Sequence, residues 1–333
     1  MTTRDIPVVS GLPDHSTIEA AMGLACRAPS VHNTQPWHWD FDGARLHLYS
    51  DPDRQLPSAD PRGRQLVISC GAALHHARTA FAAGNWHTDT VRLPDPAQPQ
   101  HLATIEFRPW PDPPPGVRTR ADAIDHRYTD RLPMLEPVGW SDLLPALRKL
   151  VSPHEIELDV LDESARSRLA TASEKSAALR RYDMLYQSEL HWWAGHAEMS
   201  EGVPPTSLVS DAEFARVGIG RRFPSVPHSM RRDDIQDRAR IVLLSSTGDS
   251  AQEWLHTGEA LSAVLLECTA AGLTTCALTH VIEVQSGRQL LANLVPRGGL
   301  PQVLVRVGSA PGHDEPAPTP RRPMTDVFTE HWQ

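Results

Sequence analysis

The segment Arg27–Trp37, RAPSVHNTQPW, holds the densest group of residues that could bind a ligand. Pro29 and Ser30 end the helix expected before it, and Asn33 and Gln35 bring two side-chain amides together just before an expected strand. A loop of amides, hydroxyls and backbone groups suits a flat heterocycle with several acceptors along its edge. The same residues could equally form a turn that caps its own backbone. The residues alone leave both interpretations open.

A second polar group, Arg127-Tyr128-Thr129-Asp130-Arg131, follows a proline-rich block. Its arginines and threonine offer two guanidinium forks and a hydroxyl, a donor set that matches phosphate oxygens. Arg321 and Arg322, in a proline-rich tail, could supply a further cation. The alternatives are a solvated basic turn for the first group and an ordinary surface pair for the second.

Other common chemistries lack their motifs. Gly218 and Gly220 are followed by Phe223, where a dinucleotide-binding fingerprint needs its third glycine. The sequence contains no Walker A, GxSxG or HExxH motif. The 17 histidines are scattered, so we expect no metal site. The four cysteines have no CxxC spacing and predict no disulfide framework, and we expect Cys276 to be a buried thiol rather than a redox group.

Composition limits the partners of this chain of 333 residues. Its net charge of −9 argues against nucleic-acid binding and against a polybasic membrane anchor. No stretch approaches the roughly 18 uninterrupted apolar residues of a membrane helix. The first residues include acids and no long apolar core, so they do not resemble a secretory signal. We therefore expect a cytoplasmic protein that binds neither nucleic acid nor membranes.

The elements that must position the two polar groups can be read from periodicity and turn signals. Before the proline block the pattern predicts a helix from Ser16 opened by a capping box, strands at 37–41 and 45–49 joined by a two-residue hairpin turn at Asp42-Gly43, a helix over 67–81, and strands at 86–93 and 104–107. After the block it predicts helices over 141–150, 163–196 and 254–268 and strands at 155–161, 240–245 and 302–307. Residues 200–234 show no convincing periodicity, which is typical of a functional or disordered loop.

The proline block 109–116 predicts a boundary, because proline lacks an N–H and fixes φ. We expect one half at 1–115 and a second at 116–333. A long helix in each half carries an internal echo: GAALHHARTAFAAG at 71–84 and GEALSAVLLECTAAG at 258–272 both begin Gly-x-Ala-Leu and end Ala-Ala-Gly. The echo is either a coincidence between alanine-rich helices or the mark of two halves built on one plan.

RAPSVHNTQPWHW closely resembles the (A/S)PSxxNxQPWxF segment that lines the isoalloxazine ring of FMN in the nitroreductase superfamily. Arg127–Arg131 match that family's R-x-(S/T)-x-(R/K) phosphate motif. The SCGAAL helix, the late AAGL helix and Arg321-Arg322-Pro323 extend the resemblance over nearly the whole chain. The fuller pattern is similar to the Acg-type nitroreductase-like proteins of actinobacteria.

The resemblance implies an α+β nitroreductase fold, with two related halves forming an intramolecular pseudo-dimer of antiparallel-rich sheets around long central helices. The phosphate motif normally stands near the start of a nitroreductase chain, whereas here it follows the proline block. Residues 1–115 would therefore supply the ring loop, and 116–333 the phosphate site. Because each flavin of the family's homodimers lies between subunits, the fusion implies one FMN per chain, in a monomer with an internal pseudo-dimer or in a homodimer.

The resemblance also implies which residues bind FMN, with no obligatory catalytic side chain. The expected FMN-binding residues are Pro29, Ser30, Val31, Asn33 and Gln35 at the ring, Arg127, Thr129, Arg131, Arg321 and Arg322 at the phosphate, and Cys276, Ala277 and Leu278 along the ring near N5. The implied reaction passes hydride from NAD(P)H to the flavin and on to a small acceptor such as a quinone or a nitroaromatic. Two alternatives stay open: an FMN storage or sequestration protein in which 200–234 forms a lid over the flavin, and a flavin-fragmenting enzyme. Residues 200–234 could instead be a surface loop unrelated to the pocket.

Overall fold

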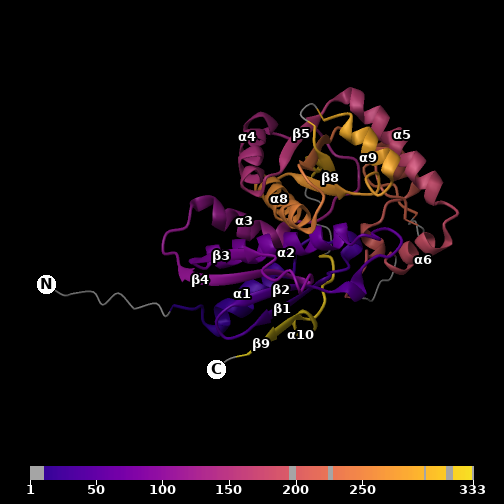
Figure 1. The fold of residues 1–333 in the computed structure, drawn as a ribbon. Helices are drawn as coiled ribbons and strands as arrows, with labels where there is room; N and C mark the ends of the chain where they lie inside the picture. The colour runs from indigo at the N-terminus through magenta and orange to yellow at the C-terminus, as the bar shows by residue number, and fades with distance from the viewer. Residues whose placement is uncertain (1–10, 195–199, 224–227, 296–297, 313–317, 332–333) are drawn as a thin grey trace.

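The structure is a computed structural model that describes residues 11–194, 200–223, 228–295, 298–312 and 318–331. It has an α+β architecture of two sheets, and the long helices α2 (Arg64–Ala83) and α8 (Ala251–Ala270) pack against each other between them (Figure 1). The α+β class is as predicted. In the described part of the chain, no helix is both long and apolar enough to cross a membrane.

The first sheet has the order β3-β4-β2-β1-β9. Its strands are β1 (Trp37–Phe41), β2 (Leu46–Ser50), β3 (Trp86–Arg92), β4 (His101–Pro109) and β9 (Phe328–Glu330). Along β1, Trp37, Trp39 and Phe41 are buried while the residues between them are partly exposed, which is the alternation of a half-buried strand. The pairing of β9 with β1 is parallel and brings the C-terminal segment beside the N-terminal half.

The second sheet has the order β5-β6-β8-β7 and is antiparallel throughout. Its strands are β5 (Glu157–Leu161), β6 (Arg240–Ser246), β7 (Thr274–Leu278) and β8 (Leu300–Gly308). If the second sheet is listed from its other edge, its order is β7-β8-β6-β5. This order matches β3-β4-β2-β1 of the first sheet, so that β5, β6, β7 and β8 correspond to β1, β2, β3 and β4. In both sheets a long helix joins the second strand to the third, and a helix, α1 (His15–Ala25) or α4 (Trp140–Val151), precedes the first. The two sheets therefore share one topology.

The echoed glycines lie where α2 and α8 cross. A Cβ added to Gly71 would lie 2.2 Å from the Leu255 carbonyl oxygen, and one added to Gly258 would lie 2.1 Å from that of Ile68. Because no side chain fits at these distances, each helix needs a glycine at this point. The shared Gly-x-Ala-Leu pattern thus has a packing reason in both helices.

Several predicted boundaries are wrong. Helix α1 begins at His15 and is capped by Asp14, whose carboxylate accepts a hydrogen bond from the Thr17 N–H at 2.8 Å, so the predicted capping box at Ser16 does not form. Strands β1 and β2 form the predicted hairpin, but residues 42–45 connect them rather than Asp42-Gly43 alone. The predicted helix over 163–196 is two helices, α5 (Glu163–Arg180) and α6 (Met184–Trp192), because Asp183 caps a new start. Residues 195 and 196 lie outside the described part.

The structure also contains short elements that periodicity missed. They are strand β9, the helices α3 (Pro115–His126), α7 (Asp211–Val217), α9 (Gln285–Ala292) and α10 (Met324–Val327) and the 3₁₀ turns η1 (Val31–Asn33), η2 (Pro52–Arg54), η3 (Ser152–His154) and η4 (Pro205–Ser207). Helix α3 begins inside the proline block because proline is tolerated in a first turn, where its missing N–H has no intrahelical partner to lose. Helix α7, in the segment predicted to be irregular, is opened by a capping box of Ser210 and Glu213.

The two sheets differ most in the connection between their first and second strands. In the first sheet β1 and β2 are joined by residues 42–45, whereas residues 162–239 join β5 and β6. We call residues 162–239 the insert; it contains α5, α6 and α7 and extends to the side of the second sheet (Figure 1).

Candidate ligand-binding site

The loop 29–35, between α1 and β1, has an unusual backbone. Three residues other than glycine have a positive φ: His32 (49°), Asn33 (57°) and Gln35 (49°). Each such residue costs on the order of 1–3 kcal/mol, and such residues cluster at functional sites. The hydrogen bonds that hold the loop include one from the Val31 N–H to the Ser69 hydroxyl on α2 (3.1 Å) and one from the Gln35 N–H to the Ser30 hydroxyl (2.9 Å).

The segment Arg127–Arg131 is held against the start of β7. The Asp130 N–H donates to the Thr275 carbonyl oxygen at 2.9 Å, and Thr129 forms a parallel bridge with Thr275. This pairing places the segment next to Cys276, although more than 140 residues separate them in sequence.

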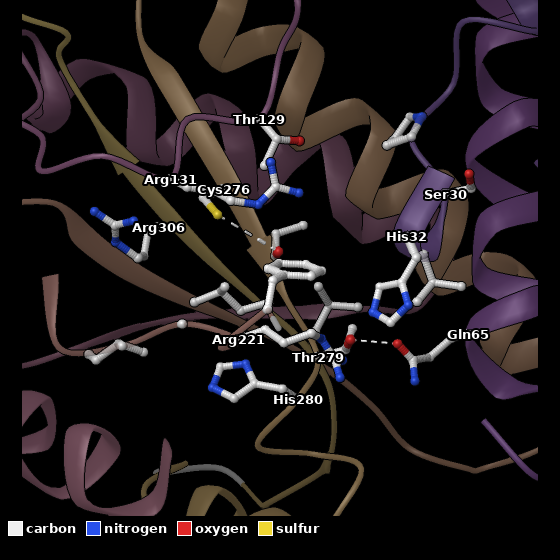
Figure 2. Close-up of a pocket in the computed structure, with 18 of the residues that line it drawn as sticks. Ser30, His32, Gln65, Thr129, Arg131, Arg221, Cys276, Thr279, His280 and Arg306 are labelled. Carbon is white, nitrogen blue, oxygen red and sulfur yellow. Dashed lines mark hydrogen bonds between the residues drawn. The ribbon is translucent and has the colours of Figure 1, made fainter. Parts of the chain in front are cut away.

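A first pocket lies between the loop 29–35, the N-terminal half of α2 and β7 (Figure 2). Eight of the predicted residues line it: Pro29, Ser30, Val31, Thr129, Arg131, Cys276, Ala277 and Leu278. The insert closes one side with the apolar side chains of Val209, Phe214, Val217, Ile219 and Phe223. In Figure 2, Arg131 and Cys276 lie across the cavity from Ser30 and His32.

A second pocket adjoins the first and shares Ser30, His32, Thr129, Arg131 and Val209 with it. Asn33, Arg127 and Arg321 also line this second pocket, so the structure brings the loop 29–35, the segment 127–131 and the C-terminal tail to one cavity. Both pockets are partly open to solvent.

Three arginines of the second pocket lack a carboxylate partner among the described residues: Arg127, Arg131 and Arg321. Arg127 and Arg321 both donate to the Arg27 carbonyl oxygen, at 3.4 and 3.0 Å, which holds their guanidinium groups together beside the loop 29–35. Burial, with nearby positive charge as the second cause, lowers the pKa of Arg127 to about 10 and that of Arg321 to about 9. Burial also lowers the pKa of Arg131.

The other two arginines of this pocket come from the insert and are neutralised. Arg231 pairs with Glu213 at 3.0 Å, and Arg232 pairs with Asp130 at 2.9 Å. Cations that are partly withdrawn from water without a counter-charge carry a desolvation cost. The donor set of Arg127, Arg131 and Arg321 therefore fits an anionic ligand group, and the phosphate of FMN meets that requirement.

Two predicted residues, Gln35 and Arg322, line neither pocket. The Gln35 amide accepts from the Arg322 N–H at 2.8 Å and donates to the Ser200 carbonyl oxygen at 3.0 Å, while Arg322 donates to the Gln35 carbonyl oxygen at 3.2 Å. Asn33, which does line the second pocket, uses its amide NH₂ on the carbonyl oxygens of Gly202 (3.0 Å) and Pro320 (3.1 Å). These amides join the loop 29–35 to the insert and the tail.

A polar group at the far end of the first pocket was not predicted. The Thr279 hydroxyl donates to the Gln65 side chain at 2.5 Å, as Figure 2 shows, and Gln65 donates to Glu283 at 3.0 Å. Arg221 of the insert pairs with Glu283. Burial alone would raise the pKa of Glu283, but the charge of Arg221 lowers it to about 2, so the pair stays ionised. These residues are far apart in sequence and form no motif, which explains why the sequence did not reveal them.

His32 was also missed, although it lies inside the motif PSVHN. It is 8% exposed, and neither ring nitrogen has a hydrogen-bond partner among the described residues. Burial, with the charge of Arg221 as the second cause, lowers the pKa of His32 well below its usual value, so the imidazole is neutral. Its ring meets that of Phe223 edge-on, with 5.9 Å between centroids.

The four cysteines are free and buried. Burial raises the pKa of Cys276, which keeps the group a thiol at neutral pH, in line with the predicted buried thiol. Within the described residues, no three His, Cys, Asp or Glu side chains come close enough to hold a metal ion.

No family model matches the chain, but comparisons with known proteins find close relatives. The chain is 46% identical to Acg of Mycobacterium tuberculosis, named as a candidate NAD(P)H nitroreductase, over 313 residues covering 93% of this chain and 95% of Acg. It is 45% identical to an uncharacterized protein of that organism over 317 residues (93% and 92%), and 36% identical to another candidate NAD(P)H nitroreductase over 326 residues (95% and 92%).

Solved structures give weaker likenesses. A candidate nitroreductase from Anabaena variabilis aligns with a TM-score of 0.47 and 10% identity over 91% of this chain and 90% of that chain. The FMN-dependent nitroreductase NfnB from Mycobacterium smegmatis, in complex with NADPH, aligns with a TM-score of 0.38 and 16% identity over 63% and 96%. On the strength of the close relatives, the chain has the nitroreductase type of fold. It belongs to the nitroreductase superfamily, and within it to the branch that contains Acg.

Proposed function

We propose that the chain is an oxidoreductase that binds one FMN, with the isoalloxazine ring in the first pocket and the phosphate in the second. The observation that carries this proposal is a group of three half-buried arginines without carboxylate partners among the described residues, Arg127, Arg131 and Arg321, next to a largely apolar cavity. A planar apolar ring that carries a dianionic phosphate satisfies both cavities at once.

When bound, FMN would supply hydride transfer between NAD(P)H and a small acceptor such as a quinone or a nitroaromatic. The residues of this chain bind and orient: the loop residues Pro29–Val31 and the strand residues Cys276–Leu278 form opposite walls of the first pocket. The apolar side chains of the insert exclude water from it. The names of the relatives as candidate NAD(P)H nitroreductases support the electron donor.

The shared topology supports the proposal that residues 1–115 and 116–333 are two fused halves of an internal pseudo-dimer. Under this proposal the loop 29–35 and α2 come from the first half, and the segment 127–131, β7 and the insert come from the second. The protein would be a monomer or a homodimer of such chains, acting in the cytoplasm. Under the same proposal, strand β9 would be exchanged between the halves, because it belongs to residues 116–333 and pairs with β1 of the first sheet.

The alternative, an FMN storage or sequestration protein, is favoured by the contacts of residues 200–223. Besides the amide contacts of Asn33 and Gln35, Glu201 forms an ion pair with Arg54 at 2.5 Å. Phe223 lines the first pocket and stacks over the Arg131 guanidinium at 5.5 Å. A lid fastened in this way would keep nicotinamide from the flavin. Residues 224–227 of the expected lid lie outside the described part.

One experiment separates the two functions. The protein is purified, any yellow ligand is identified, and NADPH is added without oxygen. Bleaching of the flavin absorbance supports the oxidoreductase, whereas persistent colour supports sequestration. A colourless protein that does not take up added FMN would contradict both.

A further inference from the structure

His32 lies where the two pockets meet. It is one of the five residues that line both, and in Figure 2 its imidazole projects from η1 into the cavity. A ligand that spans the two pockets would lie close to the residues that they share, and His32 is one of these. The position is therefore neither the apolar end of the cavity nor its cationic end.

The surroundings of His32 differ from those of an ordinary core histidine. Buried polar side chains almost always have a hydrogen-bond partner, yet both ring nitrogens of His32 lack one in the described part of the chain. The backbone is held in the left-handed conformation by turn hydrogen bonds on either side, from Asn33 N–H to Ser30 O (3.1 Å) and from Thr34 N–H to Val31 O (3.0 Å). The fold thus keeps a strained residue with two unfilled hydrogen-bonding positions.

Burial, helped by the charges of Arg221 and Arg131, lowers the pKa of His32 and keeps the imidazole neutral, whereas the charge of Glu283 acts in the opposite direction. Arg131 lies across the cavity, and Arg221 and Glu283 form an ion pair at its far end. A neutral imidazole has one N–H donor and one nitrogen acceptor. This combination suits a hydroxyl group, which both accepts and donates, better than it suits a phosphate, which at neutral pH mainly accepts.

We propose that His32 binds the hydroxyl groups of the ribityl chain, the part of FMN between ring and phosphate. This inference rests on the proposed function, because it assumes that FMN spans the two pockets. It assigns the three parts of the ligand to three parts of the cavity: the ring to the apolar walls, the hydroxyl chain to His32, and the phosphate to the arginines.

Ligand truncation tests the assignment. Dissociation constants are measured for lumiflavin, which has the ring alone, for riboflavin, which adds the ribityl chain, and for FMN, with the wild type, His32→Ala and His32→Asn. We expect His32→Ala to weaken riboflavin and FMN about tenfold, the value of one or two lost hydrogen bonds, and to leave lumiflavin unchanged. His32→Asn, which tolerates a positive φ and keeps an amide donor and acceptor, should recover part of the loss.

Arg321→Gln is the matched control, since it should weaken FMN but neither riboflavin nor lumiflavin. An equal loss for all three flavins in His32→Ala, or no loss for any, would overturn the inference. If His32→Ala does not fold, His32→Gly removes the same polar atoms with a residue that accepts a φ of 49° freely. A wild type that binds no flavin would instead refute the proposed function, so the two failures are distinguishable.

Discussion

The two sheets on either side of the α2–α8 crossing share a topology, but the arginines near them differ in whether a carboxylate neutralises them. On one side, α2 contacts η1, and the cavity beside them holds cations without a carboxylate partner among the described residues. On the other, α8 contacts η3, and Glu259 of α8 is fully buried between Arg78 (2.7 Å) and Arg92 (2.6 Å). His154 of η3 lies 3.7 Å from the same carboxylate.

The difference is that, among the described residues, no carboxylate pairs with three of the arginines of the second pocket. Where the chain supplies its own anion, the arginines and the carboxylate form a closed cluster. Where it does not, the arginines line a cavity, and under the proposed function the phosphate of FMN would supply the missing charge. The insert adds to the asymmetry, because its described residues line both pockets, whereas the ion pairs of Glu259 are with Arg78, Arg92 and His154, outside the insert. Changes to charge on the two sides should therefore have opposite effects on stability.

The largest effect is expected from Glu259→Gln. Removing one partner of a buried ion pair leaves uncompensated charge, and we expect a loss of about 3–5 kcal/mol in the free energy of unfolding, measured by denaturant titration. Glu267→Gln, which breaks a partly exposed pair with Arg120, is the control and should cost less than about 1 kcal/mol. Equal losses in the two variants would contradict the closed cluster.

The same residue predicts a pH dependence. Burial would raise the pKa of Glu259, but the Arg92 hydrogen bond and the charges of Arg78 and Arg92 lower it to about 2, against 4.5 for the unperturbed group. A lowered pKa stabilises the fold above pH 4.5, and that contribution is lost as the pH falls toward 2. The stability difference between wild type and Glu259→Gln should shrink over this interval; a constant difference would argue against an ionised Glu259.

Gly258→Ala tests the crossing that relates the two sides. The new Cβ would overlap the Ile68 carbonyl, so the helices must move apart, at a cost of about 1–3 kcal/mol. Gly23→Ala in α1 is the control, because its Cβ would meet only Met324 at 3.9 Å, and alanine favours a helix. Thermal unfolding measures both, and an unchanged Tm in Gly258→Ala would show that the helices cross elsewhere.

Arg321→Gln should change stability in the opposite direction to Glu259→Gln. Removing a half-buried cation without a carboxylate partner among the described residues should raise the Tm of the ligand-free protein, while the loss of a charge-assisted hydrogen bond, about 1.5–3 kcal/mol, should weaken FMN about 10- to 100-fold. Calorimetry gives both quantities. A lower Tm together with unchanged FMN affinity would contradict the proposal that Arg321 awaits an anionic ligand.

The smallest effect is expected from Phe223→Ala, which removes an aromatic ring of the insert from the first pocket. We expect the rate of flavin reduction by NADPH to rise a few-fold, with little change in Tm, because the residue is partly exposed. Stopped-flow absorbance measures this rate. An unchanged rate would mean that the insert does not control access to the ring.

Local patterns in the sequence predicted the parts of the fold that depend on local physics. The buried face of α1, with Ile18 and Met22, and the alternation of β1 follow directly from periodicity. The start of α6 was missed because Asp183 interrupts a stretch whose composition is helical throughout. For the site, the motif residues Ser30 and Arg127 reach neighbouring cavities, whereas Gln35 and Arg322 are used within the protein, and only the tertiary contacts with Ser200 decide that. The binding roles themselves stay predictions.

The most direct test of the account is a calorimetric titration of the ligand-free protein with FMN and, separately, with riboflavin. The account predicts one equivalent of FMN per chain and a riboflavin affinity at least about tenfold weaker, because the three arginines would bind the phosphate. Two equivalents of FMN, or equal affinities for the two flavins, would contradict it.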